Sequence, residues 1–395
     1  MNKIIYRKER FGGIFFEPQT GKISYKWQKE IPDFLRQLSA EVITIDNPLV
    51  ENCYLSAPET VGLDITQKCN LACKHCYKDS GKTAAEELTT NEIFSLIDHC
   101  RDIGVCFFFI AGGEPTMRAD LFKIIKYAKN NDIRVILVSN GVYGQDILDR
   151  ILETQPLQVR ISLEGPEKIN DFIRGKGSYQ TAVNSLKYLK ENGIDARIST
   201  HLCQLNKDCG EEIIKLANDL NVILKFSTVR PIGRAMNFDE LGLLSAEDFY
   251  STVKKILALK NKYPAVEIIS DFDCVIGQKP LKMNPGDKNS HCFAAQKEVT
   301  VNCQGEIYAC SFFSPYKEFV AGNLKTRKLI DVWSNSPVLK MMREKKPSAK
   351  CQACKYYKIN CLGGCPALAY SLAGNIRALD PLCPKLRIDS DKITK

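Results

Sequence analysis

Three cysteines follow a short apolar run in the stretch Val61-Gly62-Leu63-Asp64-Ile65-Thr66-Gln67-Lys68-Cys69-Asn70-Leu71-Ala72-Cys73-Lys74-His75-Cys76. The run predicts a strand, and the cysteines after it have the spacing C-x3-C-x2-C. Iron–sulfur cubes normally take four cysteine thiolates, so three in one tight loop leave one iron without a protein ligand. An open coordination position makes a metal site reactive rather than structural. The alternatives are a zinc site completed by His75, although zinc motifs typically come as separated C-x2-C pairs, or a cysteine-rich loop without metal.

The alternation of short apolar runs and amphipathic stretches continues to about residue 261. Two of the runs, 105–110 and 135–138, are apolar throughout, as expected for parallel strands covered on both faces. Six β-then-α units with right-handed crossovers predict a parallel sheet, either open and doubly wound or curved into an incomplete barrel, with functional groups at the C-terminal ends of the strands. Strands are expected at residues 61–65, 105–111, 134–139, 158–162, 196–202 and 223–228, and helices at 90–101, 121–130, 145–153, 179–191, 211–218 and 246–261.

The two ends of the chain do not follow this alternation. Residues 1–57 predict three short antiparallel strands and an amphipathic helix near 27–38, which together form a small N-terminal α+β module. After Tyr263 the chain is rich in turns, and residues 279–289 resemble a linker. From His291 onward the sequence predicts short strands at 298–301 and 306–308, one helix near 329–343, and many cysteines. This segment has little regular apolar pattern, so we expect metal cross-links rather than packing alone to hold it together.

Composition excludes several classes of protein. Of 395 residues, 44% are hydrophobic and 26% charged, which is typical of a globular protein with a sizeable core. No apolar run approaches the length of a membrane span, and the N-terminus is too polar for a secretory signal. The net charge of +9 mildly favours an anionic partner, but dispersed basic residues argue against nucleic-acid binding. The 17 cysteines cannot all pair, and nothing indicates an oxidising compartment, so we expect a cytoplasmic protein without membrane partners.

Further motifs follow the cysteine loop in order. Tyr77 comes directly after the last cysteine, and Gly112-Gly113-Glu114-Pro115 follows the second expected strand. Together with the C-x3-C-x2-C loop, these residues resemble the radical S-adenosylmethionine (SAM) superfamily. The resemblance implies a 4Fe–4S cluster held by Cys69, Cys73 and Cys76. It implies contacts to SAM from Tyr77, Gly112, Gly113, Glu114, Pro115, Ser139, Asn140, Ser162, Glu164 and Arg174, with Glu164 where relatives often have Asp; each strand-end motif read alone is an ordinary polar loop.

The resemblance also implies a fold and a reaction. The fold is a partial (β/α)6, TIM-like barrel, and the core with its linker is expected over residues 58–285. One electron from the cluster, supplied by a reductase, flavodoxin or ferredoxin, would cleave SAM to methionine and a 5′-deoxyadenosyl radical that abstracts hydrogen from the substrate. The cofactor supplies the difficult chemistry, and the barrel positions it and excludes water.

The C-terminal cysteines resemble a second module. Cys292 is followed after twelve residues by Gly305 and then by Cys310; Cys351-x2-Cys354-x6-Cys361-x3-Cys365 and Cys383 come next. This order resembles the SPASM extension of radical SAM enzymes, apart from one additional residue before Cys361. The resemblance implies two auxiliary 4Fe–4S clusters within residues 286–395, and so three clusters in the chain. Cys292, Cys310 and Cys365 would hold the first, with Cys303, Cys274 or an open site as its fourth position, and Cys351, Cys354, Cys361 and Cys383 the second; a zinc ribbon is the alternative.

SPASM enzymes mostly modify peptides or proteins. The N-terminal module, residues 1–57, faintly resembles the winged-helix-like element that holds a leader peptide by strand addition. Our hypothesis is a radical SAM peptide maturase that forms a thioether or carbon–carbon cross-link or a related oxidation. The alternatives are a tetrapyrrole (haem-pathway) or sulfatase-maturing enzyme and, in a different class, a non-catalytic iron–sulfur electron carrier. The sequence identifies no general base, since a lone His201 at a strand end is more often structural.

Overall fold

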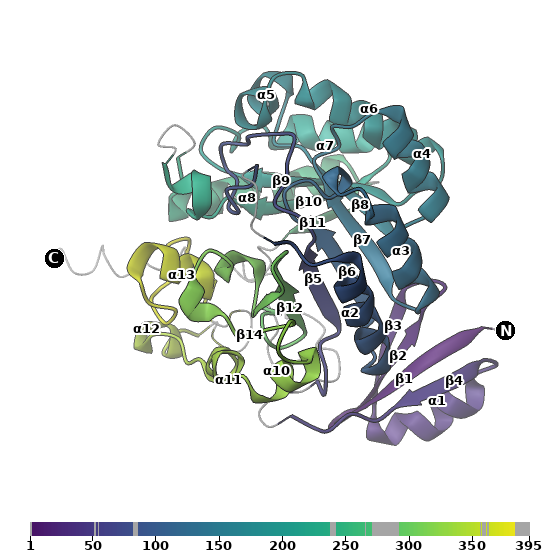
Figure 1. Cartoon of the computed structure of the whole chain (residues 1–395). Helices are drawn as coiled ribbons and strands as arrows, with labels where there is room; N and C mark the ends of the chain where they lie inside the picture. Colours follow the sequence, from purple (N-terminus) through teal and green to yellow (C-terminus); the bar gives the residue numbers. More distant parts are fainter. Residues whose placement is uncertain are drawn as a thin grey trace.

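The computed structural model describes residues 2–50, 53, 55–81, 86–237, 242–264, 266–270, 292–355, 357, 361 and 363–383 (Figure 1). The expected linker at 279–289 and Cys274 therefore lie outside the described residues. Within the described ranges, no helix combines the length and the hydropathy that crossing a membrane requires.

The expected parallel sheet is confirmed as the central element of the fold. Its strands follow the order β11-β10-β9-β8-β7-β6-β5-β12-β13-β14. The six strands of the expected β-then-α units pair in chain order, each parallel to the next. They are β5 (Thr60–Asp64), β6 (Phe107–Ala111), β7 (Arg134–Ser139), β8 (Gln158–Ser162), β9 (Ala196–Leu202) and β10 (Ile223–Thr228). The parallel strands β11 (Ile268–Ser270) and β12 (Glu298–Val301) extend it, and β13 (Glu306–Tyr308) and β14 (Gly322–Asn323) continue antiparallel.

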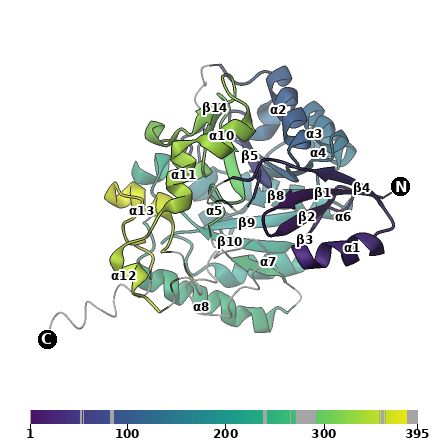
Figure 2. The same cartoon turned by 90° about the horizontal axis from the view of Figure 1, so that it is seen from below.

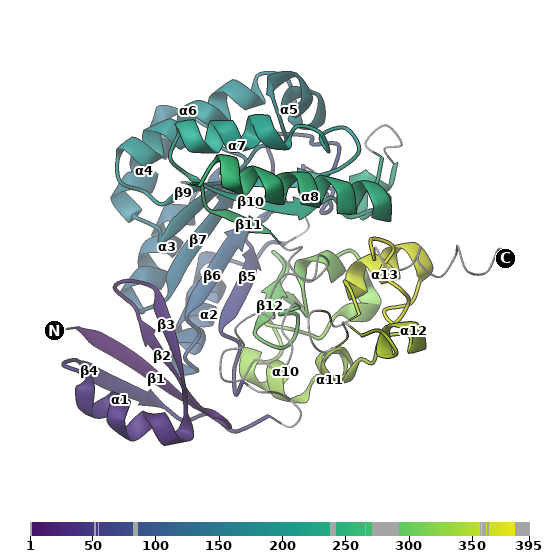
Figure 3. The same cartoon turned by 180° about the vertical axis from the view of Figure 1, so that it is seen from behind.

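Helices cover the outer face of this curved sheet (Figures 1 and 3). The capping box that starts the first of them is confirmed, because Thr89 and Glu92 exchange hydrogen bonds between side chain and backbone. A helix at Glu167–Arg174 was not expected, since its polar sequence resembles a loop. It places Arg174 in a last helical turn beside the cysteine loop. The helices are α2 (Thr90–Asp102), α3 (Leu121–Asn130), α4 (Gln145–Thr154), α5 (Glu167–Arg174), α6 (Ser178–Glu191), α7 (Gly210–Asp219) and α8 (Ala246–Lys262).

The N-terminal residues form a separate four-stranded sheet below the barrel (Figure 1). The three expected antiparallel strands and the helix are present, and an unexpected fourth strand pairs parallel to the first. One face packs on the helix through residues such as Phe15, and the other contacts the base of the barrel, where Phe16 and Phe107 meet edge to face at 5.4 Å. The elements are β1 (Lys3–Glu9), β2 (Gly12–Glu17), β3 (Lys22–Trp27), a 3-10 turn (Gln28–Glu30), α1 (Ile31–Gln37) and β4 (Glu41–Ile45).

The C-terminal segment packs more extensively than its sequence indicated. Trp333 is fully buried in the same hydrophobic core as the barrel strands, and its indole N–H donates to the Leu55 carbonyl at 3.1 Å. Packing against the barrel core therefore contributes here, while the expectation that metal cross-links also hold the segment stays a prediction. The expected helix at 329–343 is split because Pro337 starts a new helix. The helices are α10 (Leu329–Asn335), α11 (Pro337–Glu344), α12 (Ala349–Gln352) and α13 (Pro366–Ala373).

Candidate functional site

The cysteine loop leaves the C-terminal end of β5. Its three sulfurs, on Cys69, Cys73 and Cys76, lie close enough to influence one another electrostatically. Burial raises the pKa of the Cys69 and Cys73 thiols. A metal that takes these sulfurs as thiolates must therefore displace their protons. Three free thiols that converge from one loop are a donor set that suits an iron–sulfur cluster.

Two glycines directly after β6, Gly112 and Gly113, let the C-terminal end of that strand pack against the start of the cysteine loop. The backbone N–H of Gly113 donates to Thr66 at 2.8 Å, and that of Glu114 donates to Lys68 at 2.8 Å. A Cβ atom on Gly112 would lie 2.5 Å from the Thr66 carbonyl oxygen, and one on Gly113 would lie 2.2 Å from that of Lys68. Any larger residue must displace backbone, so the glycine pair fixes where the cysteine loop begins.

The carboxylate of Glu114 joins two strand ends. It is fully buried and accepts hydrogen bonds from the Thr116 backbone and hydroxyl, from Ser139 Oγ at 2.9 Å and from the Asn140 backbone at 2.8 Å. Burial raises its pKa despite these donors. The Asn140 side chain in turn donates to Asn70 Oδ1 at 2.7 Å, inside the cysteine loop. The predicted residues Glu114, Ser139 and Asn140 therefore form one network, which sequence reasoning did not extend to Asn70.

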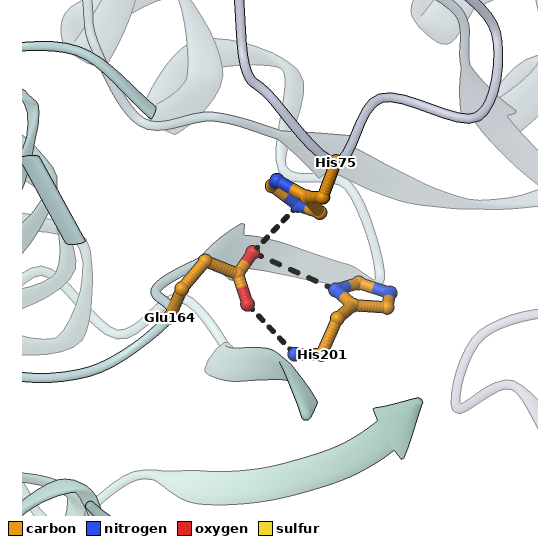
Figure 4. Close-up of side chains that lie close together, drawn as sticks. All are labelled: His75, Glu164 and His201. Atoms are coloured by element: carbon orange, nitrogen blue, oxygen red, sulfur yellow. Dashed lines mark hydrogen bonds and ion pairs between the residues drawn. The ribbon is translucent and has the colours of Figure 1, made fainter. Parts of the chain in front are cut away.

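A second buried carboxylate, Glu164 after β8, lies beside His75 and His201 (Figure 4). Its Oε1 is 2.8 Å from Arg174 Nη1 and 3.1 Å from His75 Nε2, and its Oε2 accepts from the His201 backbone at 2.7 Å. Burial favours the neutral acid, but the two histidines outweigh it and hold the pKa of Glu164 well below its usual range. His75, which sequence analysis named only as the completing ligand of an alternative zinc site, and His201, which it did not assign, thus both contact this carboxylate.

Polar atoms beside this carboxylate have no protein partner. Among the described side chains, Arg174 Nε and His75 Nδ1 are buried without a hydrogen bond. Buried polar atoms are almost always satisfied, so these two indicate a polar ligand next to the cysteine loop. A carboxylate or ribose of a nucleotide-like ligand fits such donors.

The segment after β10 holds the loop from the opposite side and was not predicted. Arg234 donates from Nε to the Cys73 carbonyl at 3.0 Å, and from Nη1 to Ser80 at 2.7 Å and Asp79 at 3.1 Å. Its backbone N–H donates to the Cys76 carbonyl at 3.0 Å. The preceding Gly233 has a φ of +62°, and a Cβ there would lie 2.4 Å from the Tyr77 carbonyl oxygen. The Gly233-Arg234 pair, a few residues after the expected strand at 223–228, was the available sequence signal.

Tyr77 connects the loop to the C-terminal segment. Its ring lies edge to face against Phe312, with centroids 5.0 Å apart, and burial raises the pKa of its hydroxyl. Next to it is a cavity of about 140 Å³ whose lining includes Cys303 and the buried Lys78–Asp64 ion pair. Burial raises the pKa of Cys303 to about 11, and the charges with the largest effect on it are those of Glu87 and Asp64. Cys303 therefore faces the barrel end.

Three of the remaining C-terminal cysteines lie close together. Cys292, Cys310 and Cys365 are close enough to influence one another electrostatically, and burial raises the pKa of Cys292 to about 11. Asp380, which the sequence did not single out, links this group to the next. Its carboxylate accepts from the Cys365 backbone at 2.7 Å, and its carbonyl accepts from the Cys383 backbone at 2.9 Å. Cys351, Cys354 and Cys361 are half-buried nearby in sequence, on α12 and the turns after it.

Comparisons with known families and proteins agree with this geometry. A family model described as the radical SAM superfamily matches residues 63–220, and one for SPASM, an iron–sulfur cluster-binding domain, matches residues 292–355. Mycofactocin maturase MftC from Mycobacterium ulcerans is 30% identical over 335 residues, covering 83% of this chain and 88% of the relative. The AdoMet-dependent heme synthase of Nitratidesulfovibrio vulgaris is 25% identical over 350 residues, covering 82% and 91%.

Solved structures share the fold. Streptococcus suis SuiB bound to its precursor peptide SuiA superposes with a TM-score of 0.79 at 16% identity, over 97% of this chain and 100% of that one. The protein anSMEcpe with bound AdoMet and a peptide gives 0.68 at 16% identity, over 85% and 100%. The likeness to SuiB thus extends through the N-terminal sheet as well as the barrel and the C-terminal segment.

Proposed function

Because the chain belongs to the radical SAM superfamily and carries a SPASM domain, we propose that it is an enzyme that modifies a ribosomally made peptide, forming a thioether or carbon–carbon cross-link or a related oxidation. The observation that carries this proposal is the loop of Cys69, Cys73 and Cys76 at the C-terminal ends of the barrel strands, joined to a cysteine-rich C-terminal segment. The similarity to a mycofactocin maturase and to a precursor-peptide-bound fold supports a peptide substrate.

The cofactors are SAM and 4Fe–4S clusters. When bound, they supply a 5′-deoxyadenosyl radical that abstracts hydrogen from the substrate. The chain's own residues bind and orient them. We assign the SAM-binding cluster to Cys69, Cys73 and Cys76. The SAM contacts that we assign are Tyr77, Gly112, Gly113, Glu114, Pro115, Ser139, Asn140, Ser162, Glu164 and Arg174. Within that set, the Glu114 carboxylate accepts hydrogen bonds from Ser139 Oγ on Oε1 and from the Asn140 backbone on Oε2, so it helps to fix both residues.

Arg174 has the most direct role in binding that we assign. Its Nη1 is held by Glu164, while its buried Nε has no hydrogen-bond partner in the part of the chain that the structure describes and can donate to the SAM carboxylate. Glu164 acts as a positioning residue, because it is fully buried behind Arg174 and His75. The pair keeps a guanidinium oriented at the edge of the cysteine loop before ligand arrives, which lowers the cost of ordering it on binding.

We assign two auxiliary clusters to the C-terminal cysteines. Cys292, Cys310 and Cys365 form the first set. Its fourth ligand is Cys303, which is turned toward the barrel end, or Cys274, which lies outside the described residues, or the fourth position is open. The second set is Cys351, Cys354, Cys361 and Cys383. We place the enzyme in the cytoplasm, with a reductase, flavodoxin or ferredoxin as electron donor, because reduced clusters need a reducing compartment.

Anaerobic reconstitution tests the proposal. With dithionite and SAM, the enzyme should release 5′-deoxyadenosine, Cys73→Ala should abolish the release, and iron content should be about twelve per chain. Co-expression with the peptide encoded beside its gene should remove two hydrogens from that peptide's mass. Absence of 5′-deoxyadenosine would favour an electron carrier. Turnover of a porphyrin with no change in any peptide would favour a tetrapyrrole enzyme, which the similarity to heme synthases makes the second candidate.

A further inference from the structure

A groove lies at the base of the barrel, at the opposite ends of the strands from the cysteine loop. Its volume is about 640 Å³, and it separates the turn at Pro18 and Gln19 from the loops that lead into β7, β8 and β9. Figure 2 views this end of the molecule, with the N-terminal sheet in front of the barrel. The turn touches the barrel, since a Cβ on Gly21 would lie 2.8 Å from Leu157 Cδ2. The groove is thus built jointly by the N-terminal sheet and the barrel.

Two cations in this groove have no anion. Lys129, in the last turn of α3, and Arg134, the first residue of β7, are both half-buried and line it. Burial lowers the pKa of Arg134, and burial together with the charge of Arg134 lowers that of Lys129. Among the described residues neither has an acidic partner; Arg134 Nε is buried without any partner, and Lys129 Nζ has only the Thr154 carbonyl at 3.4 Å.

The acidic residues of the groove are already neutralised. Asp132 pairs with Lys3, and Asp195 pairs with Arg197 at 2.8 Å and accepts from Gln158 at 3.0 Å. The two repelling cations therefore remain uncompensated in a partly dehydrated site. Binding of an anion would remove this repulsion and restore the depressed pKa values. A guanidinium whose Nε–H has no partner among the described residues, beside an ammonium, is a suitable receptor for carboxylates.

We propose that this groove binds the carboxylate side chains of an acidic leader segment of the peptide substrate. The inference rests on the proposed peptide-modifying function and adds a docking site to it. The volume lies in the range of sites that hold whole organic ligands, about 300–1,000 Å³, and exceeds what one inorganic anion fills. Its apolar lining, with Pro18, Pro156, Leu157 and Ile194, suits the side chains between acidic residues. The chain's net charge of +9 also favours an acidic partner.

The position of the groove constrains the substrate. The barrel strands are five to seven residues long, so their two ends lie about 20 Å apart at about 3.3 Å per residue. A peptide held in the groove must reach from the base of the barrel to the cysteine loop. The spacer between its acidic segment and the modified residue must therefore be at least about six residues, even when fully extended.

Fluorescence anisotropy on the reconstituted full-length enzyme tests the proposal. The probe is a labelled eight-residue peptide of alternating glutamate and leucine, compared with its glutamine counterpart. We expect binding of the glutamate peptide only, weakened about tenfold by Lys129→Gln and by Arg134→Gln. Lys126→Gln is the matched control, because Lys126 lies on the same helix, is exposed and does not line the groove. Since Arg134 is half-buried, the Lys129 variant carries the test if Arg134→Gln does not fold.

Other outcomes contradict the proposal. Equal binding by wild type and Lys129→Gln would place the acidic peptide elsewhere. Displacement of the probe by inorganic phosphate or glutarate at the peptide's own concentration would show that the groove takes small anions. Release of 5′-deoxyadenosine does not depend on the groove. Its absence would refute the proposed function, whereas its presence without peptide binding would refute only the docking site.

Discussion

Replacing Glu164 with glutamine should destabilise the site more than any other isosteric change. The substitution keeps the side-chain size but removes the charge that lies 2.8 Å from Arg174 and 3.1 Å from His75. Breaking a buried ion pair by removing one partner costs about 3–5 kcal/mol. An amide nitrogen in place of Oε2 would also face the His201 backbone N–H, and an orphaned buried donor costs about 1–3 kcal/mol. Because both effects act at one carboxylate, they do not simply add, and we expect the free energy of unfolding to fall by about 4 kcal/mol.

Thermal unfolding and SAM binding measure this loss. The apparent unfolding midpoint of Glu164→Gln should fall by about 5 °C, and its dissociation constant for SAM should rise by about tenfold, because Arg174 loses its orientation. Glu167→Gln is the matched control, since Glu167 is exposed one turn away on α5. A midpoint and a SAM affinity equal to those of the control variant would refute the assignment of Glu164 as a positioning residue.

The same carboxylate gives a pH dependence. The folded-state pKa of Glu164 lies well below its usual value, whereas in the unfolded chain it is about 4.3. Its stabilising contribution is therefore complete above about pH 4.3 and is lost as the pH falls through the folded-state pKa. The difference in midpoint between wild type and Glu164→Gln should therefore not shrink from pH 7 to 5. A difference that shrinks across that interval would contradict the depressed pKa.

Three further substitutions test how the cysteine loops are held. Arg234→Ala removes the hydrogen bonds to the loop and should raise the SAM dissociation constant about tenfold, with Arg234→Lys intermediate; a change below twofold, at unchanged iron content, would show that this residue does not position the loop. Gly113→Ala places a methyl group 2.2 Å from the Lys68 carbonyl oxygen and should lower loop-bound iron by about four atoms per chain. Full iron content would mean that the backbone after β6 can shift to make room for the methyl group. Asp380→Ala should release auxiliary iron while 5′-deoxyadenosine formation persists, because its carboxylate holds the Cys365 backbone; retention of all the iron would contradict that role.

Much of the barrel was predictable from the sequence because its signals are local. Each buried strand is an apolar run, and helices such as the one that Thr89 caps have their own start signals. Local signals failed where tertiary contacts decide the structure. The strand β4 forms because it can pair with β1 far away in sequence, and α5 forms although its sequence is polar. Pro337 divides what the apolar pattern indicated as one helix.

The cysteine loop could be located from spacing, but its supports could not. Arg234 contacts Cys73 across 161 residues of sequence, and no local pattern encodes such a contact. Glu164 was singled out as a candidate SAM contact, and the structure shows that it is fully buried behind Arg174. Sequence patterns therefore predicted candidate ligand-binding groups, which stay predictions, and the fold determines which of those side chains are held by their neighbours.

Electron paramagnetic resonance of the reduced enzyme, recorded with and without SAM, tests the central claim most directly. The claim is that the cluster held by Cys69, Cys73 and Cys76 has an iron that no protein atom occupies. We predict that SAM changes the signal of one cluster and that replacing these three cysteines with alanine removes that signal while the auxiliary ones remain. A wild-type spectrum that is identical before and after saturating SAM would contradict the account.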